Sequence, residues 1–257
     1  MSQSKPLANP VNVEYLYDGS LPGLYCCVYE SVYEKEIPLD ILAEADAPPS
    51  LLERRLILTD MEKAKRVRAS IPKKISARAM ELIETVFLSC LEKKEMAILR
   101  FLLFAYRHGK NAADMWHHPL VDPLIKAEKH LLGERHLLLG FIRFSDYDGF
   151  LFSTITPKNY ILPFLKTHFI NRFSNENFMI YDKTHGAALI YENRNWSIVS
   201  LENADIREPS EEEQSYRALW KQFYNTIAIE ARTNHKCRMT HMPKRYWENM
   251  LEVKDLL

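Results

Sequence analysis

Glycine is scarce in this sequence, with 7 residues among 257. Nowhere do these glycines form the G-x-G-x-x-G pattern of dinucleotide-binding loops or the Walker pattern that cradles phosphates. The G-x-S-x-G turn of the α/β-hydrolases is missing as well. The sequence therefore argues against nucleotide binding through a glycine-rich loop and against a serine-hydrolase nucleophile.

Cysteine is also rare, and its four residues have no metal-binding spacing. Cys26 and Cys27 are adjacent, Cys90 and Cys237 are isolated, and no C-x-x-C pair occurs. Structural zinc and iron–sulfur sites need such clustered thiolates. We therefore predict no metal site and no cofactor from the sequence.

The chain has no net charge, because 34 Lys and Arg residues balance 34 Asp and Glu residues. Attraction to nucleic acid must then come from local patches rather than from a long-range field. The first ten residues lack the apolar core of a signal peptide, and apolar runs such as FLLFAY (101–106) are too short to cross a bilayer. We expect a cytoplasmic protein with no membrane partner.

The first 60 residues predict a β-α-β start. An aromatic-rich strand is expected at 13–19, a helix at 21–36 with Leu24 and later apolar residues at four-residue spacing, and a second strand at 55–60. Two adjacent prolines predict that 38–50 is a linker without regular structure. We expect the two strands to be neighbours in one sheet.

A helical region follows, from 61 to about 139. Thr59 and Glu62 have the spacing of a capping box that opens its first helix. Apolar residues from Ile75 onward recur at the 3.6-residue period. A segment that is apolar nearly all round, 97–106, is expected at the centre of the helical layer, with Gly109 as its C-terminal stop. The last helix of the region is predicted at roughly 120–138.

The second half reads as a sheet with one inserted helix. A hairpin is expected at 141–156, a helix at 159–173, and a three-stranded meander at 178–201. Ser210 then caps a long helix that precedes a basic tail. The predicted fold class is α+β with an antiparallel sheet of about five strands. We expect one compact domain over 1–257, which could also divide into a mainly helical part, 13–139, and a sheet part, 140–252.

Three residues are candidates for acid–base catalysis: Glu134, His136 and Asp182. His130 and Glu134 are four residues apart on one helix face, whereas His136 is displaced around the helix. Two ligands do not complete a metal site, but Glu134 could act as an acid or base with a group outside the helix. The alternative is that it forms a structural hydrogen bond at the end of the helix.

Asp182 and two further histidines have similarly open roles. Asp182 and His185 flank a hairpin turn, where Asp commonly bonds its own backbone, so a catalytic role and a turn role both remain. His168 lies among Phe164, Leu165 and Phe169. It could be a core histidine or could take part in binding.

The segment from Ala231 to Trp247 contains no acidic residue. Cations next to aromatic rings are typical of proteins that bind single-stranded nucleic acid, but a structural tail is the alternative. An earlier basic stretch, 54–78, is typical of a solvated helix face. The candidate binding residues in the C-terminal segment are Arg232, Asn234, Lys236, Arg238, Lys244, Arg245, Tyr246 and Trp247.

Segments along nearly the whole chain, from about 13 to 252, resemble a bacterial family labelled as DNA metabolism proteins. The resemblance rests on segments that occur in the family's order: YLYDGSLPGLYCCVYESVYEKEIP, ILTDMEKAKRV, ERHLLLGFIRF, ITPKNYILPFLKTHFINRF, FMIYDKTHGAALIY, LWKQFYNTIAIEAR and MPKRYWENMLE. It implies the stand-alone partner of a radical-SAM protein that acts in DNA modification or repair. The resemblance also implies a relation to domains that are fused to uracil-DNA-glycosylase-like domains.

The resemblance adds Arg143 and His168 to the candidate binding positions, and it supplies no catalytic residue. This sequence differs from the family pattern at Leu137, where a basic residue is expected, and at His235, where a proline is expected. The first difference weakens a phosphate-binding role for the helix that carries Glu134.

Three functional hypotheses follow. The leading one is an accessory protein of DNA repair or modification that binds DNA with modest affinity and works with a radical-SAM partner. The second is an enzyme that acts directly on a nucleobase or a phosphodiester, and the third is a protein–protein adaptor that makes no contact with DNA.

Overall fold

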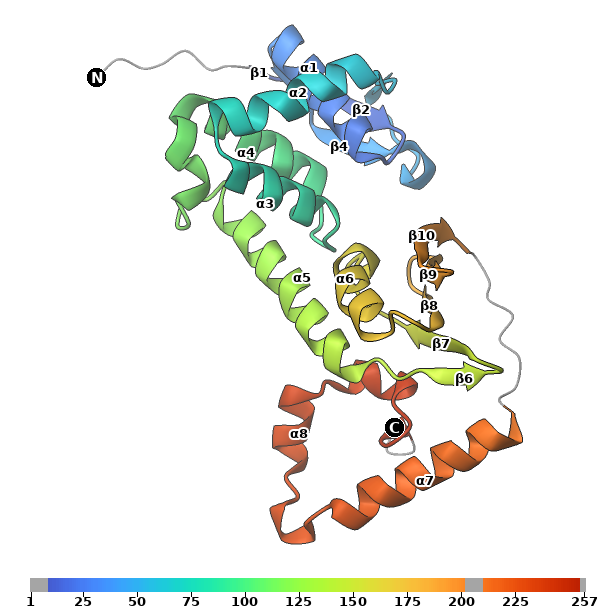
Figure 1. The fold of residues 1–257 in the computed structure, drawn as a ribbon. Helices are drawn as coiled ribbons and strands as arrows, with labels where there is room; N and C mark the ends of the chain where they lie inside the picture. The colour runs from blue at the N-terminus through green and yellow to red at the C-terminus, as the bar shows by residue number, and fades with distance from the viewer. Residues whose placement is uncertain (1–8, 202–209, 255–257) are drawn as a thin grey trace. The chain divides into compact units, whose positions relative to one another are not determined.

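A computed structural model describes residues 9–201 and 210–254 (Figure 1). The chain divides into two compact units, residues 1–131 and residues 132–257. Both units combine helices and strands, which confirms the α+β class. Among the described residues, no helix has the length and apolar character needed to cross a membrane.

Unit 1 begins with a three-stranded parallel sheet in the order β4-β2-β5. The central strand β2 (Val13–Tyr17) pairs with β4 (Asp40–Ala43) and with β5 (Glu53–Leu56). Helix α1 (Leu21–Glu34) provides the crossover that parallel strands require. The predicted β-α-β start is confirmed. The prediction that 38–50 lacks regular structure is wrong at β4, because the two prolines follow this strand rather than interrupt it.

Polar side chains fix the connection from β2 into α1. The Ser20 hydroxyl accepts a hydrogen bond from the Gly23 N–H at 3.0 Å and so caps the helix. The Asp18 carboxylate accepts hydrogen bonds from the hydroxyls of Ser20 and Thr59, both at 2.7 Å. The predicted capping role of Thr59 is therefore wrong. Asp60 caps the following helix instead.

The helical region contains several helices with short breaks. Ile75 and Ser76 separate the first two helices, and Ser76 caps the second through the Ala79 N–H. Gly109 ends the third helix at a φ of +67°, as predicted. The elements are α2 (Met61–Lys74), α3 (Ala77–Phe87), α4 (Lys94–His108), the 3₁₀ helix η2 (Gly109–Asp114) and α5 (Asp122–Phe141).

Helix α4 lies in the core of unit 1, as its all-round apolar sequence predicts. Ile98, Leu99, Phe101 and Leu102 are fully buried. Three shorter elements complete the unit. They are β1 (Asn9–Pro10), β3 (Glu36–Ile37), which pairs in parallel with β1, and the 3₁₀ helix η1 (Glu44–Asp46).

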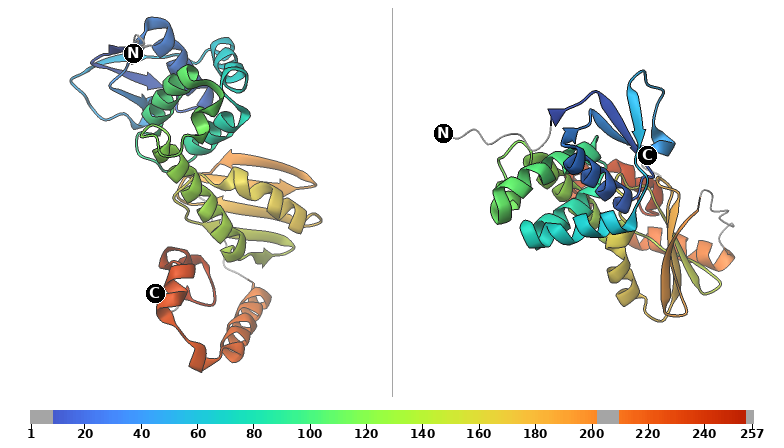
Figure 2. Two further views of the ribbon diagram at one scale, coloured as in Figure 1. Left: turned by 90° about the vertical axis from the view of Figure 1, so that its left-hand side faces the viewer. Right: turned by 90° about the horizontal axis from the view of Figure 1, so that it is seen from above.

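Unit 2 is built on a five-stranded sheet in the order β10-β9-β8-β7-β6. Helix α6 (Leu162–Arg172) lies against one face of this sheet (Figure 2). The predicted strand at 141–144 is wrong, because α5 continues to Phe141. The strands are β6 (Ser145–Tyr147), β7 (Phe150–Ile155), β8 (Asn177–Asp182), β9 (Ala187–Glu192) and β10 (Asn195–Ser200).

The sheet is mixed, whereas the sequence predicts an antiparallel one. Strands β7 and β8 are parallel, and the other three pairs are antiparallel. Helix α6 connects β7 to β8. It carries the chain back to the end of the sheet where β7 begins, so both strands run in the same direction. The strand number and the inserted helix are as predicted.

The C-terminal part of unit 2 is helical. Ser210 caps α7 (Glu211–Ile227) by accepting the Glu213 N–H at 3.2 Å, as predicted. The segment expected to be a basic tail is folded. It contains the 3₁₀ helix η3 (Glu230–Arg232), α8 (His235–His241) and the 3₁₀ helix η4 (Lys244–Asn249).

Candidate functional site

Glu134 connects α5 to the C-terminal segment. The residue is 2% exposed, and its carboxylate accepts hydrogen bonds from the Asn159 N–H at 2.9 Å, the Asn159 side-chain amide at 2.6 Å and the Lys158 N–H at 3.1 Å. The Tyr246 hydroxyl donates to it at 3.2 Å, and the Arg245 guanidinium lies at 3.0 Å. We name these groups the Glu134 anchor: Glu134, Asn159, Arg245, Tyr246 and the Lys158 N–H.

The hydrogen bonds of this anchor keep Glu134 ionised. Burial acts to raise the pKa of Glu134, but the donors on Lys158 and Asn159 and the charge of Arg245 outweigh it, and the pKa is lowered. Burial and the nearby carboxylate raise the pKa of Tyr246 to about 12. At neutral pH, Glu134 is therefore a carboxylate and Tyr246 is a neutral phenol.

These contacts are typical of a structural carboxylate. A general acid needs a raised pKa to carry a proton at neutral pH, and a general base needs a free lone pair facing the substrate. Glu134 has a lowered pKa, and protein donors surround its oxygens. The geometry favours the structural alternative stated for Glu134 above.

His136 and Asp182 do not join Glu134 in one cluster. His136 is exposed on α5 and, among the described residues, makes no hydrogen bond to either carboxylate. Asp182 lies at the end of β8 with a fully buried side chain. The structure thus places the three catalytic candidates in separate environments.

Asp182 instead forms a pair with His185. One carboxylate oxygen lies 2.6 Å from His185 Nδ1, and the other accepts the N–H groups of Thr184 and His185 at 3.0 and 3.2 Å. The His185 side chain is 26% exposed, and its ring meets Tyr160 edge-on at 5.5 Å. Burial and the Asp182 charge raise the pKa of Tyr160. A buried carboxylate therefore orients a partly exposed imidazole.

Two binding candidates outside the C-terminal segment have different surroundings. Arg143 forms an ion pair with Glu252 at 2.6 Å and also donates to the carbonyl of Gly140 at 2.7 Å. Burial acts to raise the pKa of Glu252, yet Arg143 holds it below its ordinary value. His168 is exposed, so of the two alternatives given for it the core histidine is wrong. The periodic apolar pattern of α6 places Leu165 and Phe169 in the core and His168 outside it.

Tyr246 and Trp247 are core residues of unit 2. They are 3% and 4% exposed, and the indole N–H of Trp247 donates to the Met242 carbonyl at 2.9 Å. Neither ring is available to stack on a nucleic-acid base in this fold, because each is covered by its own unit. Within the predicted binding segment, these aromatics fix the chain in place and leave contact with a ligand to other residues.

The candidate binding residues that precede Met242 all reach solvent, fully or in part. Arg232, Asn234 and Lys236 are exposed, and Arg238 is half-buried. Asn234 caps α8 by accepting the Cys237 N–H at 2.9 Å. Among the described residues, no carboxylate forms an ion pair with Arg232, Lys236 or Arg238. Lys244 is also exposed, and its ammonium lies 5.6 Å from the Trp247 ring centroid.

Several residues of the site have little signal in the sequence. Asn159 and Glu252 stand far along the chain from Glu134 and Arg143, and only the fold brings each pair together. His185 could be found, since it follows Asp182 by three residues in a turn. In the described ranges 9–201 and 210–254, no three metal-binding side chains come together.

Comparisons with known proteins give a family and little beyond it. No curated protein matches this chain. A solved structure described as the pGpG-specific phosphodiesterase PggH from Vibrio cholerae overlaps 85% of this chain and 99% of its own, at a TM-score of 0.33 and 11% identity. The model of DUF4130, a domain of unknown function, matches residues 92–252. The chain therefore belongs to the DUF4130 family.

Proposed function

We propose that this protein is an accessory factor of DNA repair or modification that binds nucleic acid through the basic segment from Arg232 to Lys244. The observation that carries the proposal is the charge of this segment. It has no acidic residue, and its cations are solvent-accessible without a described carboxylate partner. Unpaired cations on a surface are the groups that neutralise phosphates.

The buried residues that follow the segment support this function. Tyr246, Trp247 and the Glu134–Arg245 ion pair hold the end of the segment to the core of unit 2. An anchored segment loses less conformational freedom on binding than a free tail does, so more of its interaction energy appears as affinity. The net charge of the whole chain is zero, and we expect an affinity in the micromolar range or weaker at physiological salt.

The radical-SAM partner belongs to the same proposal and rests on the resemblance to DNA metabolism proteins. Helix α7 presents an apolar stripe suited to a protein contact. Tyr216, Leu219, Phe223 and Ile227 are all more than half exposed along one face of the helix. Exposed apolar patches of this kind commonly mark interaction sites. A second contact through a partner would raise the effective affinity for DNA.

The test is the salt dependence of binding to a labelled single-stranded oligonucleotide. The logarithm of affinity should fall by about 0.7 per phosphate contact for each decade of salt. Replacing Lys236 and Arg238 together by Ala should lower this slope by about 1 to 1.5 and leave the melting temperature unchanged. The matched control is Lys158→Ala with Arg172→Ala, which removes one exposed lysine and one exposed arginine elsewhere in unit 2.

Two outcomes would contradict the proposal. One is an unchanged slope in the Lys236/Arg238 variant. The other is an equal loss in both double variants, which would indicate a diffuse charge effect without a site.

A second candidate function is favoured by the Asp182–His185 pair. A buried carboxylate that orients a partly exposed imidazole is the arrangement of a general base. The enzyme hypothesis then rests on His185 rather than on Glu134. If the enzyme hypothesis is correct, His185→Gln should slow the conversion of an oligonucleotide substrate by about 10²–10⁴-fold. Mass spectrometry of the oligonucleotide measures this conversion. Absence of any conversion by the wild-type protein would favour the accessory function.

A further inference from the structure

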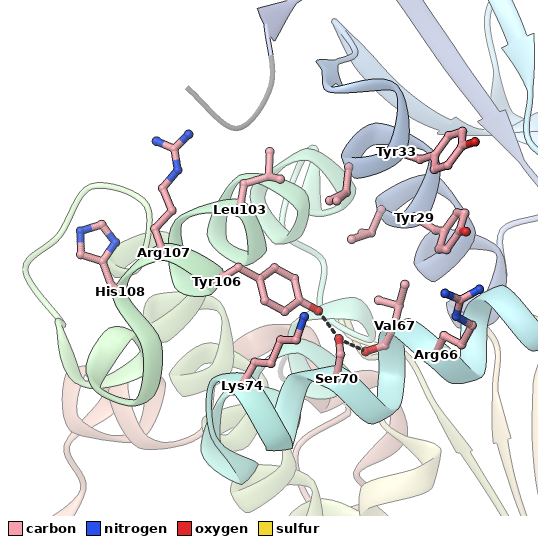
Figure 3. Close-up of a pocket in the computed structure, with 12 residues that line it drawn as sticks. Tyr29, Tyr33, Arg66, Val67, Ser70, Lys74, Leu103, Tyr106, Arg107 and His108 are labelled. Carbon is pink, nitrogen blue, oxygen red and sulfur yellow. Dashed lines mark hydrogen bonds between the residues drawn. The ribbon is translucent and has the colours of Figure 1, made fainter. Parts of the chain in front are cut away.

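Unit 1 contains a cavity of about 980 Å³ among α1, α2 and α4, shown in Figure 3. Val28, Val67 and Leu103 form an apolar floor, and all three are less than 9% exposed. Pockets for small organic ligands commonly have volumes of about 300–1,000 Å³. The cavity is thus large enough for a ligand of drug or nucleotide size.

Aromatic rings stand on two walls of this cavity. Tyr29 and Tyr33 extend from α1 with parallel rings, 10° apart in orientation and 6.1 Å between centroids. Tyr33 is 70% exposed, although it is a large aromatic residue on a helix. Tyr106 extends into the cavity from α4, and its hydroxyl forms a hydrogen bond of 2.5 Å with the Ser70 hydroxyl on α2. Flat apolar surfaces are therefore available to a planar ligand.

The charges that line the cavity are all positive. Arg66 and Lys74 come from α2 and Arg107 from α4, and no Asp or Glu belongs to the described lining. Arg66 Cζ lies 5.6 Å from the centroid of Tyr29, and Lys74 Nζ lies 6.0 Å from that of Tyr106. Arg66 and Lys74 form no ion pair with a described carboxylate. Arg66 and Lys74 thus each lie beside a ring and are available to an anion.

We propose that this cavity binds a nucleotide, with its base on the tyrosine rings and its phosphate on Lys74. Alternating aromatic and cationic groups are the means by which proteins bind unpaired nucleotides, because each base has a π-face and each phosphate a charge. A purely apolar ligand would leave the cations unused. A small anion such as phosphate would leave the rings uncovered. The site does not depend on the C-terminal basic segment.

Binding can be measured by titrating the full-length protein with thymidine 5′-monophosphate and with a short oligothymidylate that carries one photoreactive 5-iodouracil. We expect Tyr33→Ala and Lys74→Glu each to weaken binding by about fivefold or more. Tyr33→Phe keeps the ring and should restore the wild-type affinity. Crosslinks should map to peptides that contain Tyr29, Tyr33 or Tyr106.

The matched control is Lys73→Glu, which makes the same charge change on α2 at an exposed residue outside the lining. It should alter affinity by less than about twofold, because exposed charges outside contact distance are screened by salt. Equal losses in Lys73→Glu and Lys74→Glu would overturn the inference. So would crosslinks outside the cavity, or inorganic phosphate competing as well as the mononucleotide.

The two probes distinguish the sources of the nucleotide. Comparable binding of both identifies a single nucleotide unit as the ligand, and binding of the oligonucleotide alone identifies a strand. Both results support the site. The experiment is repeated in the Lys236→Ala/Arg238→Ala background, where crosslinks to the cavity should persist even if the proposed function of the basic segment is wrong.

Discussion

The Arg245 guanidinium lies 3.0 Å from the Glu134 carboxylate, and the Glu134 side chain is completely buried. This ion pair joins the middle of α5 to the 3₁₀ helix η4. Tyr246 lies beside it and donates a hydrogen bond to the same carboxylate. The two residues that the sequence suggests for catalysis and for DNA binding are thus partners in the core of one unit.

Loss of Arg245 should therefore destabilise the protein. Arg245→Ala leaves the buried Glu134 charge without its ionic partner, and we expect the free energy of unfolding to fall by about 2–4 kcal/mol. Urea denaturation measures this change. Lys244→Ala is the control, because Lys244 is exposed and should stay within about 0.5 kcal/mol of the wild type. Equal stability of the two variants would show that the pair contributes little.

Acid should weaken unit 2 through Glu134 and Glu252, two carboxylates whose pKa is lowered in the folded protein. The folded-state pKa values of Glu134 and Glu252 lie below the ordinary value of 4.5. Their contribution to stability is complete above that value and is lost as the pH falls through the lower, folded-state pKa. Wild type and Glu134→Gln should therefore differ in urea unfolding at pH 7, and the difference should shrink as the pH falls below 4.5. A difference that does not change with pH would contradict this assignment.

Trp247→Ala should act on stability rather than on partner binding. Trp247 is 4% exposed, and its indole N–H donates a hydrogen bond to the Met242 carbonyl. Its removal therefore leaves a cavity and an unpaired acceptor. We expect a loss of about 3–5 kcal/mol, measured by thermal or urea unfolding. A variant with unchanged stability that no longer binds a partner would instead mean that Trp247 is an interface residue.

The apolar stripe of α7 should matter for a complex and little for folding. Leu219→Glu with Phe223→Glu adds charge at side chains that are 59% and 54% exposed. We expect co-elution with the proposed radical-SAM partner on size-exclusion chromatography to be lost, with no change in melting temperature. Lys221 lies on the same helix, and Lys221→Glu provides a charge-matched comparison. Separate elution of the two wild-type proteins would contradict the partnership.

Local patterns predict much of this fold. The cap at Ser210, the stop at Gly109 and the apolar period of the helices each depend on neighbouring residues, and the structure has all three. Local patterns do not predict the parallel β7–β8 pair or the strand β4. Strand pairing depends on the path that the chain takes between the strands. A strand of four residues is too short to carry a clear periodic signal.

The site is less predictable than the fold for a similar reason. Composition identifies the acid-free stretch that ends at Trp247, but it does not distinguish the exposed Lys236 from the paired Arg245. Burial makes that difference, and it comes from α5 and from the loop at Asn159. Arg66 and Lys74 likewise belong to a stretch typical of a solvated face, and only the approach of α1 and α4 gives them a shared cavity.

The position of Arg245 in the chain sets an order on protein synthesis. Glu134 is made early and its ionic partner late, so a nascent chain carries the Glu134 carboxylate without Arg245 and Tyr246 until η4 has been translated. A charge in that state resists burial. The core of unit 2 should then form only after η4 has been translated. Messenger RNAs truncated before the Arg245 codon should yield products that cellular proteases degrade.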